Sequence, residues 1–149
     1  MQDSELPLCG LGWYDRRVSS RYSESEARTI RSFVRERKRQ QRSRLAARLE
    51  AARKDFEAVV AMIVASYDPA RIYQWGSLLE ERHFSEISDI DLAVEGITDP
   101  ASLSAMRADA ERLTAFPLDI VAIEHIHPAY AEHIRRRGRI VYERKSPGS

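Results

Sequence analysis

Two motifs, Trp75-Gly76-Ser77 and Ser88-Asp89-Ile90-Asp91-Leu92-Ala93-Val94, form the stretch that decides how this chain folds. Eleven residues separate the serine of the first motif from the first aspartate of the second. The residues before the glycine predict a strand over Arg71–Trp75. The run Ile90–Val94 predicts a second strand, and because it is nearly all apolar we expect it to be central in its sheet. A Gly-Ser turn thus ends one strand, and an Asp-x-Asp pair opens the next.

The sequence after this stretch alternates helix and strand signals. Asp99 followed by Pro100 is typical of a helix start, and the apolar face of that helix consists of Leu103, Met106, Ala110 and Leu113. Leu118–Ile123 predicts a third strand, Pro128 starts a helix through Arg137 that Gly138 caps, and Arg139–Tyr142 predicts a fourth strand. The predicted fold class is α/β (α+β), a small mixed sheet flanked by helices.

The N-terminal part of the chain predicts a long helix. Residues 1–22 contain Pro, Gly and Ser and read as irregular, whereas Ser23 and Glu26 form a capping box. No Gly or Pro follows until Asp68-Pro69, which ends the helix. Residues 35–44 carry no apolar side chain, so this span should protrude or break. After it, an apolar seam returns at steps of four and three: Leu45, Leu49, Ala52, Phe56, Val59 and Ile63.

Composition and charge set limits on the function. The chain has 149 residues, enough for one ordinary domain, and 32% of them are charged. Residues 1–57 hold 14 basic and 9 acidic side chains, a net +5, whereas residues 58–149 hold 10 and 14, a net −4. No apolar run approaches the length of a membrane span, and the N-terminus does not resemble a secretory signal. With a single cysteine, Cys9, the chain fits a cytoplasmic location.

The basic span 35–44 predicts an interaction surface. A protein partner, or another subunit of an oligomer, is the favoured interpretation. Binding to nucleic acid through phosphates is the alternative, which the absence of interleaved aromatic residues disfavours. A solvated helix face explains the same residues equally well.

Three carboxylates carry the predicted chemistry. In a strand, residues i and i+2 face the same way, so Asp89 and Asp91 should converge and repel each other unless a divalent cation relieves the repulsion. Asp119, inside the third predicted strand, would complete a site for one or two metal ions. An acid in an apolar strand is costly to bury without a cation or a donor.

The Gly-Ser turn is predicted to bind phosphate. Gly76 lets the backbone approach a phosphate closely, and Ser77 can donate a hydrogen bond to it. Ser88 and, more loosely, Arg82 extend this nucleotide-binding set. Trp75 could stack on a base, although packing at the strand end is its more common role. A lone Gly-Ser is only a turn and a lone Asp-x-Asp is often exposed, so it is the order of the motifs that carries the prediction.

These motifs resemble the minimal nucleotidyltransferases, a branch of the polymerase-beta superfamily. The apolar-Gly-Ser element, the Ser-Asp-Ile-Asp-Leu-Ala-Val segment, Pro117–Val121 and Ile134–Glu143 carry the resemblance, which covers about residues 70–143. It implies the polymerase-beta-like fold. The expected organisation is an irregular segment over 1–22, a helical extension over 23–67, a nucleotidyltransferase domain over 68–145 and a tail over 146–149.

The resemblance also implies a reaction, the transfer of AMP from ATP to a hydroxyl with release of pyrophosphate. Asp89 and Asp91 would hold Mg²⁺, with two ions expected. Asp119 would bind the catalytic ion and help to activate the attacking hydroxyl. Many members of the family are antitoxins that pair with a HEPN-domain ribonuclease toxin and resemble enzymes that place AMP on a tyrosine of that toxin.

Two other functions stay open. A catalytically weak or inactive member would neutralise a toxin by binding alone, and a third class of nucleotidyltransferase acts on RNA or a small molecule. The segment Leu78–Glu86 is where the chain departs from the family pattern, because Glu80, Glu81 and Glu86 bring negative charge near the expected triphosphate.

Overall fold

The computed structural model describes residues 21–80, 84–85 and 88–147. The chain divides into two compact units, residues 1–44 and residues 45–149. Predictions for residues 1–20, including Cys9, and for Arg82 lie outside the described residues. Within the described part of the chain, no helix is both long enough and apolar enough to cross a lipid bilayer.

Helix α2, Glu24–Tyr67, begins and ends where the sequence predicts. The backbone N–H of Ser23 donates to Glu26 Oε2 at 2.8 Å and the N–H of Glu26 donates to Ser23 Oγ at 3.3 Å, which is a reciprocal capping box. The helix stops at Asp68, whose φ of 47° lies in the left-handed region. Pro69 then disfavours further helical backbone. The span 35–44 does not break the helix.

The second half of α2 belongs to the core of the second unit. The seam residues from Leu49 to Ile63 are buried there, and Leu45 packs against them. The second unit accordingly begins at Leu45, because this apolar helix face covers the sheet.

The second unit contains one four-stranded mixed sheet. Its strands are β1 (Arg71–Trp75), β2 (Ile90–Glu95), β3 (Leu118–Ala122) and β4 (Arg139–Glu143). The order across the sheet is β3-β2-β1-β4, so β2 is internal as its apolar sequence predicts. Strand β1 runs antiparallel to β2 and β4, whereas β2 and β3 are parallel. The α/β class and the mixed sheet are confirmed.

Helix α3, Pro100–Glu111, connects β2 to β3, and α4, Pro128–Arg137, connects β3 to β4. Asp99 caps α3 by accepting a hydrogen bond from the N–H of Ser102 at 2.9 Å. Strand β3 ends one residue earlier than predicted, because Ile123–His125 turns into the short 3₁₀ helix η2. Gly138 ends α4 at an ordinary φ of −72°. A Cβ there would meet the carbonyl oxygen of Ile134 at 2.6 Å, which explains the glycine.

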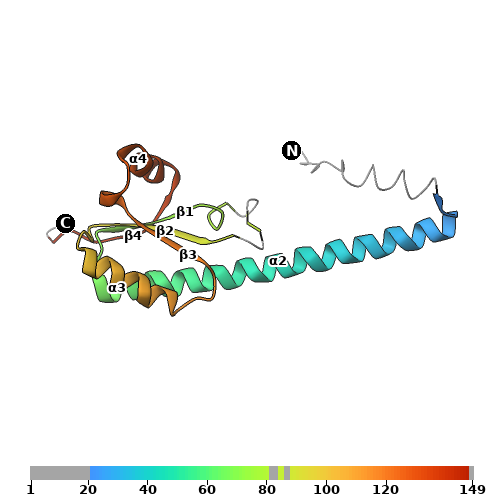
Figure 1. Ribbon diagram of the computed structural model, residues 1–149, viewed down its shortest axis with the longest axis horizontal. Helices are drawn as coiled ribbons and strands as arrows, with labels where there is room; N and C mark the ends of the chain where they lie inside the picture. The colour runs from blue at the N-terminus through green and yellow to red at the C-terminus, as the bar shows by residue number, and fades with distance from the viewer. Residues whose placement is uncertain (1–20, 81–83, 86–87, 148–149) are drawn as a thin grey trace. The chain divides into compact units, whose positions relative to one another are not determined.

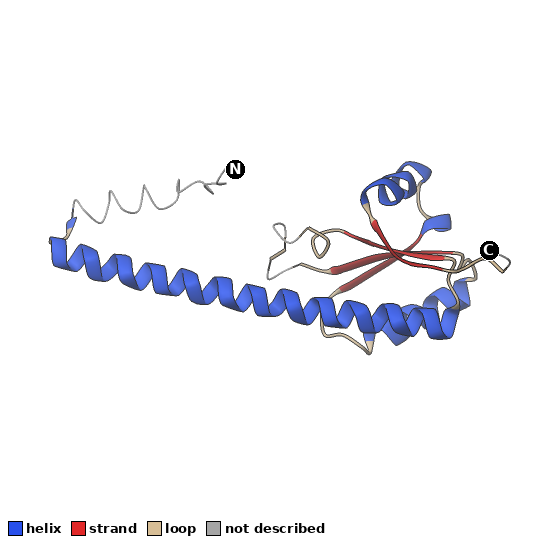
Figure 2. Ribbon diagram, turned by 180° about the vertical axis from the view of Figure 1, so that it is seen from behind, coloured by secondary structure: helices blue, strands red, loops and turns tan. Residues whose placement is uncertain are grey.

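The two faces of the sheet bury different clusters. Figure 1 shows α4 on one face, with α3 and the C-terminal part of α2 on the other. The α2–α3 face buries Ile72, Ile90, Leu92, Val94 and Ile120. The α4 face buries Tyr73 and Ala93 against Ile123, Ala131 and Ile134. This three-layer arrangement of the second unit is also visible from behind (Figure 2). Because side chains alternate along a strand, Asp91 and Asp119 lie on the α4 face.

Candidate active site

Asp91 and Asp119 are direct neighbours across the parallel pair β2–β3. Adjacent strands lie about 4.8 Å apart, so two side chains in register on one face stand side by side. Pro117 fixes this register, because its carbonyl oxygen accepts a hydrogen bond from the N–H of Ile90 at 2.8 Å. The structure therefore brings together two carboxylates that are 28 positions apart in the sequence.

The Gly-Ser turn lies against the same carboxylate. Trp75 is the cross-strand partner of Asp91, so Gly76 follows directly beside it. A Cβ on Gly76 would stand 2.2 Å from Asp91 Oδ2, and the glycine has a φ of +78°. Both facts require glycine at this position. The two sequence motifs thus meet at one end and on one face of the sheet.

The turn after Gly76 is anchored to the core. The carbonyl oxygen of Gly76 accepts hydrogen bonds from the N–H groups of Leu79 and Glu80, at 3.2 and 3.4 Å. Leu78 is fully buried in the α2–α3 cluster. Ser77 is held between these two fixed points and remains partly exposed, as a phosphate-binding hydroxyl needs to be.

Asp91 is the electrostatically strained member of the site. Its pKa is raised from 3.8 to about 6, first by burial and then by the negative charges of Asp119 and Asp89. A like-charged, half-buried carboxylate of this kind is stabilised when a cation or a proton shares the site. The three acids are therefore close enough for the negative charges of Asp119 and Asp89 to raise the pKa of Asp91.

Asp119 is less buried than its position in an apolar strand predicts. Its side chain is exposed, because β3 is an edge strand of the sheet and has solvent on its outer side. Asp89 precedes the first residue of β2 and is exposed as well. Of the three predicted acids, only Asp91 is partly buried, and the cost expected for an acid buried in β3 does not arise.

The described residues contain no ready-made group of three or more His, Cys, Asp or Glu side chains arranged to hold a metal ion. The adjacent pair Asp91–Asp119 nevertheless fits Mg²⁺, which takes oxygen ligands and is commonly bound by one or two carboxylates plus substrate phosphates. The raised pKa of Asp91 supports this fit, since a cation would relieve the repulsion that causes it. Asp89 would join from the strand start.

Ser88 has a structural partner. It is buried, and its hydroxyl accepts a hydrogen bond from the N–H of Ser85 at 2.8 Å. Its own N–H donates to the carbonyl oxygen of Ser85 at 3.1 Å. These bonds hold Ser88 to Ser85 directly before Asp89. The role of Ser88 in nucleotide binding stays a prediction.

Tyr130, in the first turn of α4, is a site residue that the sequence did not reveal. Its ring packs edge-to-face on Trp75, with centroids 5.5 Å apart and planes at 87°. Burial, then the charge of Asp119, then that of Asp91, raises the pKa of its hydroxyl. Trp75 thus packs at the strand end, and its indole N–H is buried without a hydrogen-bond partner among the described residues. An aromatic pair borders the carboxylates.

The position of α4 over the site is fixed at its other end. Arg135 binds Glu95 with Nη2 2.8 Å from Oε1, and the hydroxyl of Tyr73 donates to Oε2 of the same carboxylate at 3.0 Å. Burial opposes the ionisation of Glu95, but these hydrogen bonds outweigh it and lower its pKa. Together with buried Ala131 and Ile134, this network holds α4 on the sheet.

Two hollows border the site. One, of about 510 Å³, lies between Glu80 after the Gly-Ser turn and the α4 residues Ala129, Glu132, His133, Arg136 and Arg137. The other, of about 250 Å³, follows β3 past Asp119 and is closed by Arg107 and Glu111 of α3. The first hollow lies beside α4, and neither the three aspartates nor Gly76 and Ser77 line it.

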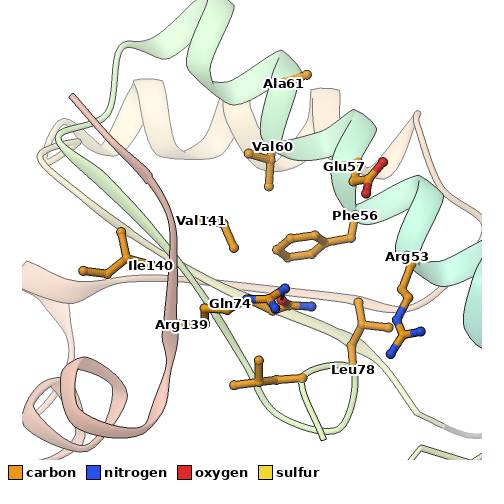
Figure 3. A pocket seen from close by; sticks show the side chains of 11 residues that line it. Arg53, Phe56, Glu57, Val60, Ala61, Gln74, Leu78, Arg139, Ile140 and Val141 are labelled. Atoms are coloured by element: carbon orange, nitrogen blue, oxygen red, sulfur yellow. Dashed lines mark hydrogen bonds between the residues drawn. The ribbon is translucent and has the colours of Figure 1, made fainter. Parts of the chain in front are cut away.

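A separate groove of about 580 Å³ lies on the opposite face, between α2 and the edge strand β4. Figure 3 shows Phe56 of α2 pointing into it, with Arg139 beside Gln74. Arg139 Nη2 donates to Gln74 Oε1 at 2.7 Å. Because Gln74 faces away from Asp91, this groove does not belong to the carboxylate site.

Of the residues that the sequence assigns to the site, the structure gathers Gly76, Ser77, Asp91 and Asp119 at one end of the sheet, with Asp89 beside them. It adds Tyr130 from α4. No protein-family model matches this chain, and no curated protein matches its sequence.

Proposed function

We propose that the chain is a metal-dependent nucleotidyltransferase with a polymerase-beta-like fold, which transfers AMP from ATP to a hydroxyl. One observation carries the proposal. The Gly-Ser turn, predicted to bind phosphate, packs against Asp91, predicted to hold the metal, so closely that a side chain at Gly76 would displace the Asp91 carboxylate. A triphosphate bound at the turn would then lie beside the carboxylate pair.

The residues would divide the work as follows. Gly76 and Ser77 bind the phosphates, and Asp91 with Asp119 and Asp89 holds Mg²⁺. When bound, the ion neutralises phosphate charge and polarises the phosphoryl oxygens. Tyr130, packed on Trp75 and near the charges of Asp119 and Asp91, would border the nucleotide.

The reaction balances with the groups at hand. The acceptor oxygen forms a bond to the α-phosphorus while the bond from that phosphorus to the bridging oxygen breaks, and pyrophosphate leaves. Asp119 accepts the proton of the acceptor hydroxyl, as its exposed position at the edge of the sheet allows. Asp91 is less suited to this role because its neighbours crowd it.

The acceptor we propose is a hydroxyl, most simply a tyrosine, on a HEPN-type toxin, which makes the chain the antitoxin of a toxin–antitoxin pair. The support is the resemblance carried by the Gly-Ser and Asp-x-Asp motifs. The rival is an antitoxin that neutralises by binding alone. The two differ in whether replacing the aspartates changes the outcome.

An assay with purified protein, labelled ATP, Mg²⁺ and the candidate toxin would test the proposal. The candidate toxin is the product of the neighbouring gene. We expect label on the partner, and we expect Asp89→Asn combined with Asp91→Asn to abolish it while circular dichroism stays unchanged. If the double variant labels the partner as well as the wild type does, the assignment of Asp89 and Asp91 as metal ligands is wrong. A double variant that still neutralises the partner fully, with no label from the wild type, establishes the binding-only rival.

A further inference from the structure

The basic run of α2, residues 35–44, is a distinct surface outside the second unit. It contains six basic and one acidic side chain, a net +5, and all ten residues are exposed. Its one acid, Glu36, pairs with Arg39, with Oε1 2.9 Å from Nη2. None of its side chains is apolar, and the helix continues through it without interruption.

A solvated helix face explains this run poorly. Like charges three and four positions apart, such as Arg35 with Arg39 and Lys38 with Arg42, each destabilise a helix by a few tenths of a kcal/mol. The exposed positions of the same helix after residue 45 mix the two signs, as Glu50, Lys54 and Glu57 show. The helix therefore carries its densest run of like charges here, where a polyanion would compensate the repulsion.

The chemistry of the run also narrows the partner. Cores of protein interfaces are poor in charge and rich in aromatic anchors, which this span lacks. Lying on a membrane surface requires an apolar helix face, which is missing as well. The sequence alone favours a protein partner, but the exposed all-polar helix favours a phosphate backbone.

The placement of the charges around the helix selects the kind of nucleic acid. At 3.6 residues per turn, Arg35, Lys38, Arg39 and Arg42 fall within an arc of about 100°. Arg37 and Arg44 lie about 160° from the middle of that arc. The helix thus carries two stripes of cations on opposite sides. Stripe one consists of Arg35, Lys38, Arg39 and Arg42, and stripe two consists of Arg37 and Arg44.

We propose that this run binds duplex DNA by lying in the major groove, where each stripe faces one phosphate backbone. An α-helix about 10–12 Å across fits a B-form groove about 12 Å wide, with phosphates along both flanks. A-form RNA has a deep, narrow major groove that does not admit the helix. Because the six cations face the phosphates in this arrangement, only Gln40, Gln41 and Ser43 are left to read base edges, and binding depends weakly on sequence.

Fluorescence anisotropy of the full chain with a short labelled DNA duplex tests the proposal. With up to six phosphate contacts, we expect the affinity to fall about a thousandfold between 50 and 200 mM salt. Arg35→Gln with Arg42→Gln removes half of stripe one, and Arg37→Gln with Arg44→Gln removes stripe two. Each pair should reduce the slope of log affinity against log salt by about 2.

The matched control is Arg112→Gln with Lys145→Gln, two exposed cations of the second unit, which should leave the slope unchanged. Circular dichroism checks that α2 stays helical in every variant. The proposal is overturned if the chain does not bind duplex DNA at 50 mM salt, if either stripe variant keeps the wild-type slope, or if duplex RNA of the same sequence binds as tightly. Loss of a protein partner from the stripe variants, without DNA binding, assigns the run to that partner instead.

Discussion

At the scale of single residues, Gly76 connects the fold to the proposed chemistry. Its positive φ and its contact with Asp91 mean that a methyl group at this position would be strained and would displace the carboxylate. Gly96, at the other end of β2, has a similar φ of +92°, and a Cβ there would also make a close contact, 2.7 Å from the Cβ of Ala70. A comparison of substitutions at the two glycines therefore distinguishes the cost of backbone strain from an effect on the site.

Gly76→Ala and Gly96→Ala should each lower the free energy of unfolding, by about 1–3 kcal/mol, since both force a side chain into a left-handed backbone conformation. Only Gly76→Ala should also weaken Mg²⁺–ATP binding, because only there does the new methyl group displace Asp91. Urea denaturation and titration calorimetry measure the two effects. Equal loss of ATP binding in both variants would show that the turn has no special relation to the site.

Asp91 gives the stability of the protein a pH dependence. Its pKa is about 6 in the folded protein and 3.8 is its ordinary value, so between these values the folded state keeps a proton that the unfolded state loses. The free energy of unfolding therefore falls as the pH rises through this window. The limit is about 3 kcal/mol, and solvent screening reduces it to about 1 kcal/mol.

Urea denaturation in EDTA at pH 4 and pH 7 measures this fall. In Asp91→Asn the contribution should be absent, so the variant should be the more stable protein at pH 7. Adding Mg²⁺ at pH 7 should stabilise the wild type and leave Asp91→Asn nearly unaffected. An unchanged pH dependence in the variant would contradict the assigned origin of the strain.

At the scale of elements, α2 has two parts with different roles. Its C-terminal part presents an apolar seam to the sheet, and Ile63 is completely buried there. Its N-terminal part includes Phe33, which is 64% exposed. The same helix thus offers a core position and a surface position with the same backbone conformation.

Ile63→Ala should lower the free energy of unfolding by about 2–5 kcal/mol, because it removes a buried side chain and leaves a cavity. Phe33→Ala, its counterpart on the exposed part of the helix, should change it by no more than about 0.5 kcal/mol. Thermal or urea unfolding followed by circular dichroism compares the two. A large loss in Phe33→Ala would mean that the N-terminal part of α2 is packed in the core.

The sequence predicted the elements of the second unit well and their arrangement only in part. Periodicity and capping signals located α2, α3 and α4 because these signals are local. The edge position of β3, and with it the exposure of Asp119, depends on the strand order, which local patterns do not contain. The place of Tyr130 at the site could not be predicted for the same reason, since only the packing of α4 on the sheet brings it to Trp75.

At the scale of the whole molecule, the chain consists of two units joined through one helix. The second unit has its own core, the sheet and the candidate site, whereas the basic run lies in the first. Binding of a nucleotide and binding of a polyanion are accordingly assigned to different parts of the chain.

A chain that begins at residue 45 should fold and keep the carboxylate site, because the seam from Leu49 to Ile63 stays with the sheet. We expect a cooperative thermal transition and unchanged affinity for Mg²⁺–ATP, together with complete loss of duplex DNA binding. Calorimetry and anisotropy give both answers on one preparation. Retained DNA binding would place the polyanion site in the second unit.

The transfer of AMP is the central claim, and the position of the label in ATP tests it most directly. With Mg²⁺ and the neighbouring-gene product, ATP labelled at the α-phosphate should leave label on the partner, and ATP labelled at the γ-phosphate should leave none and release labelled pyrophosphate. Both signals should vanish in Asp89→Asn with Asp91→Asn. Label transferred from the γ-phosphate instead, or from neither position, would contradict nucleotidyl transfer at this site.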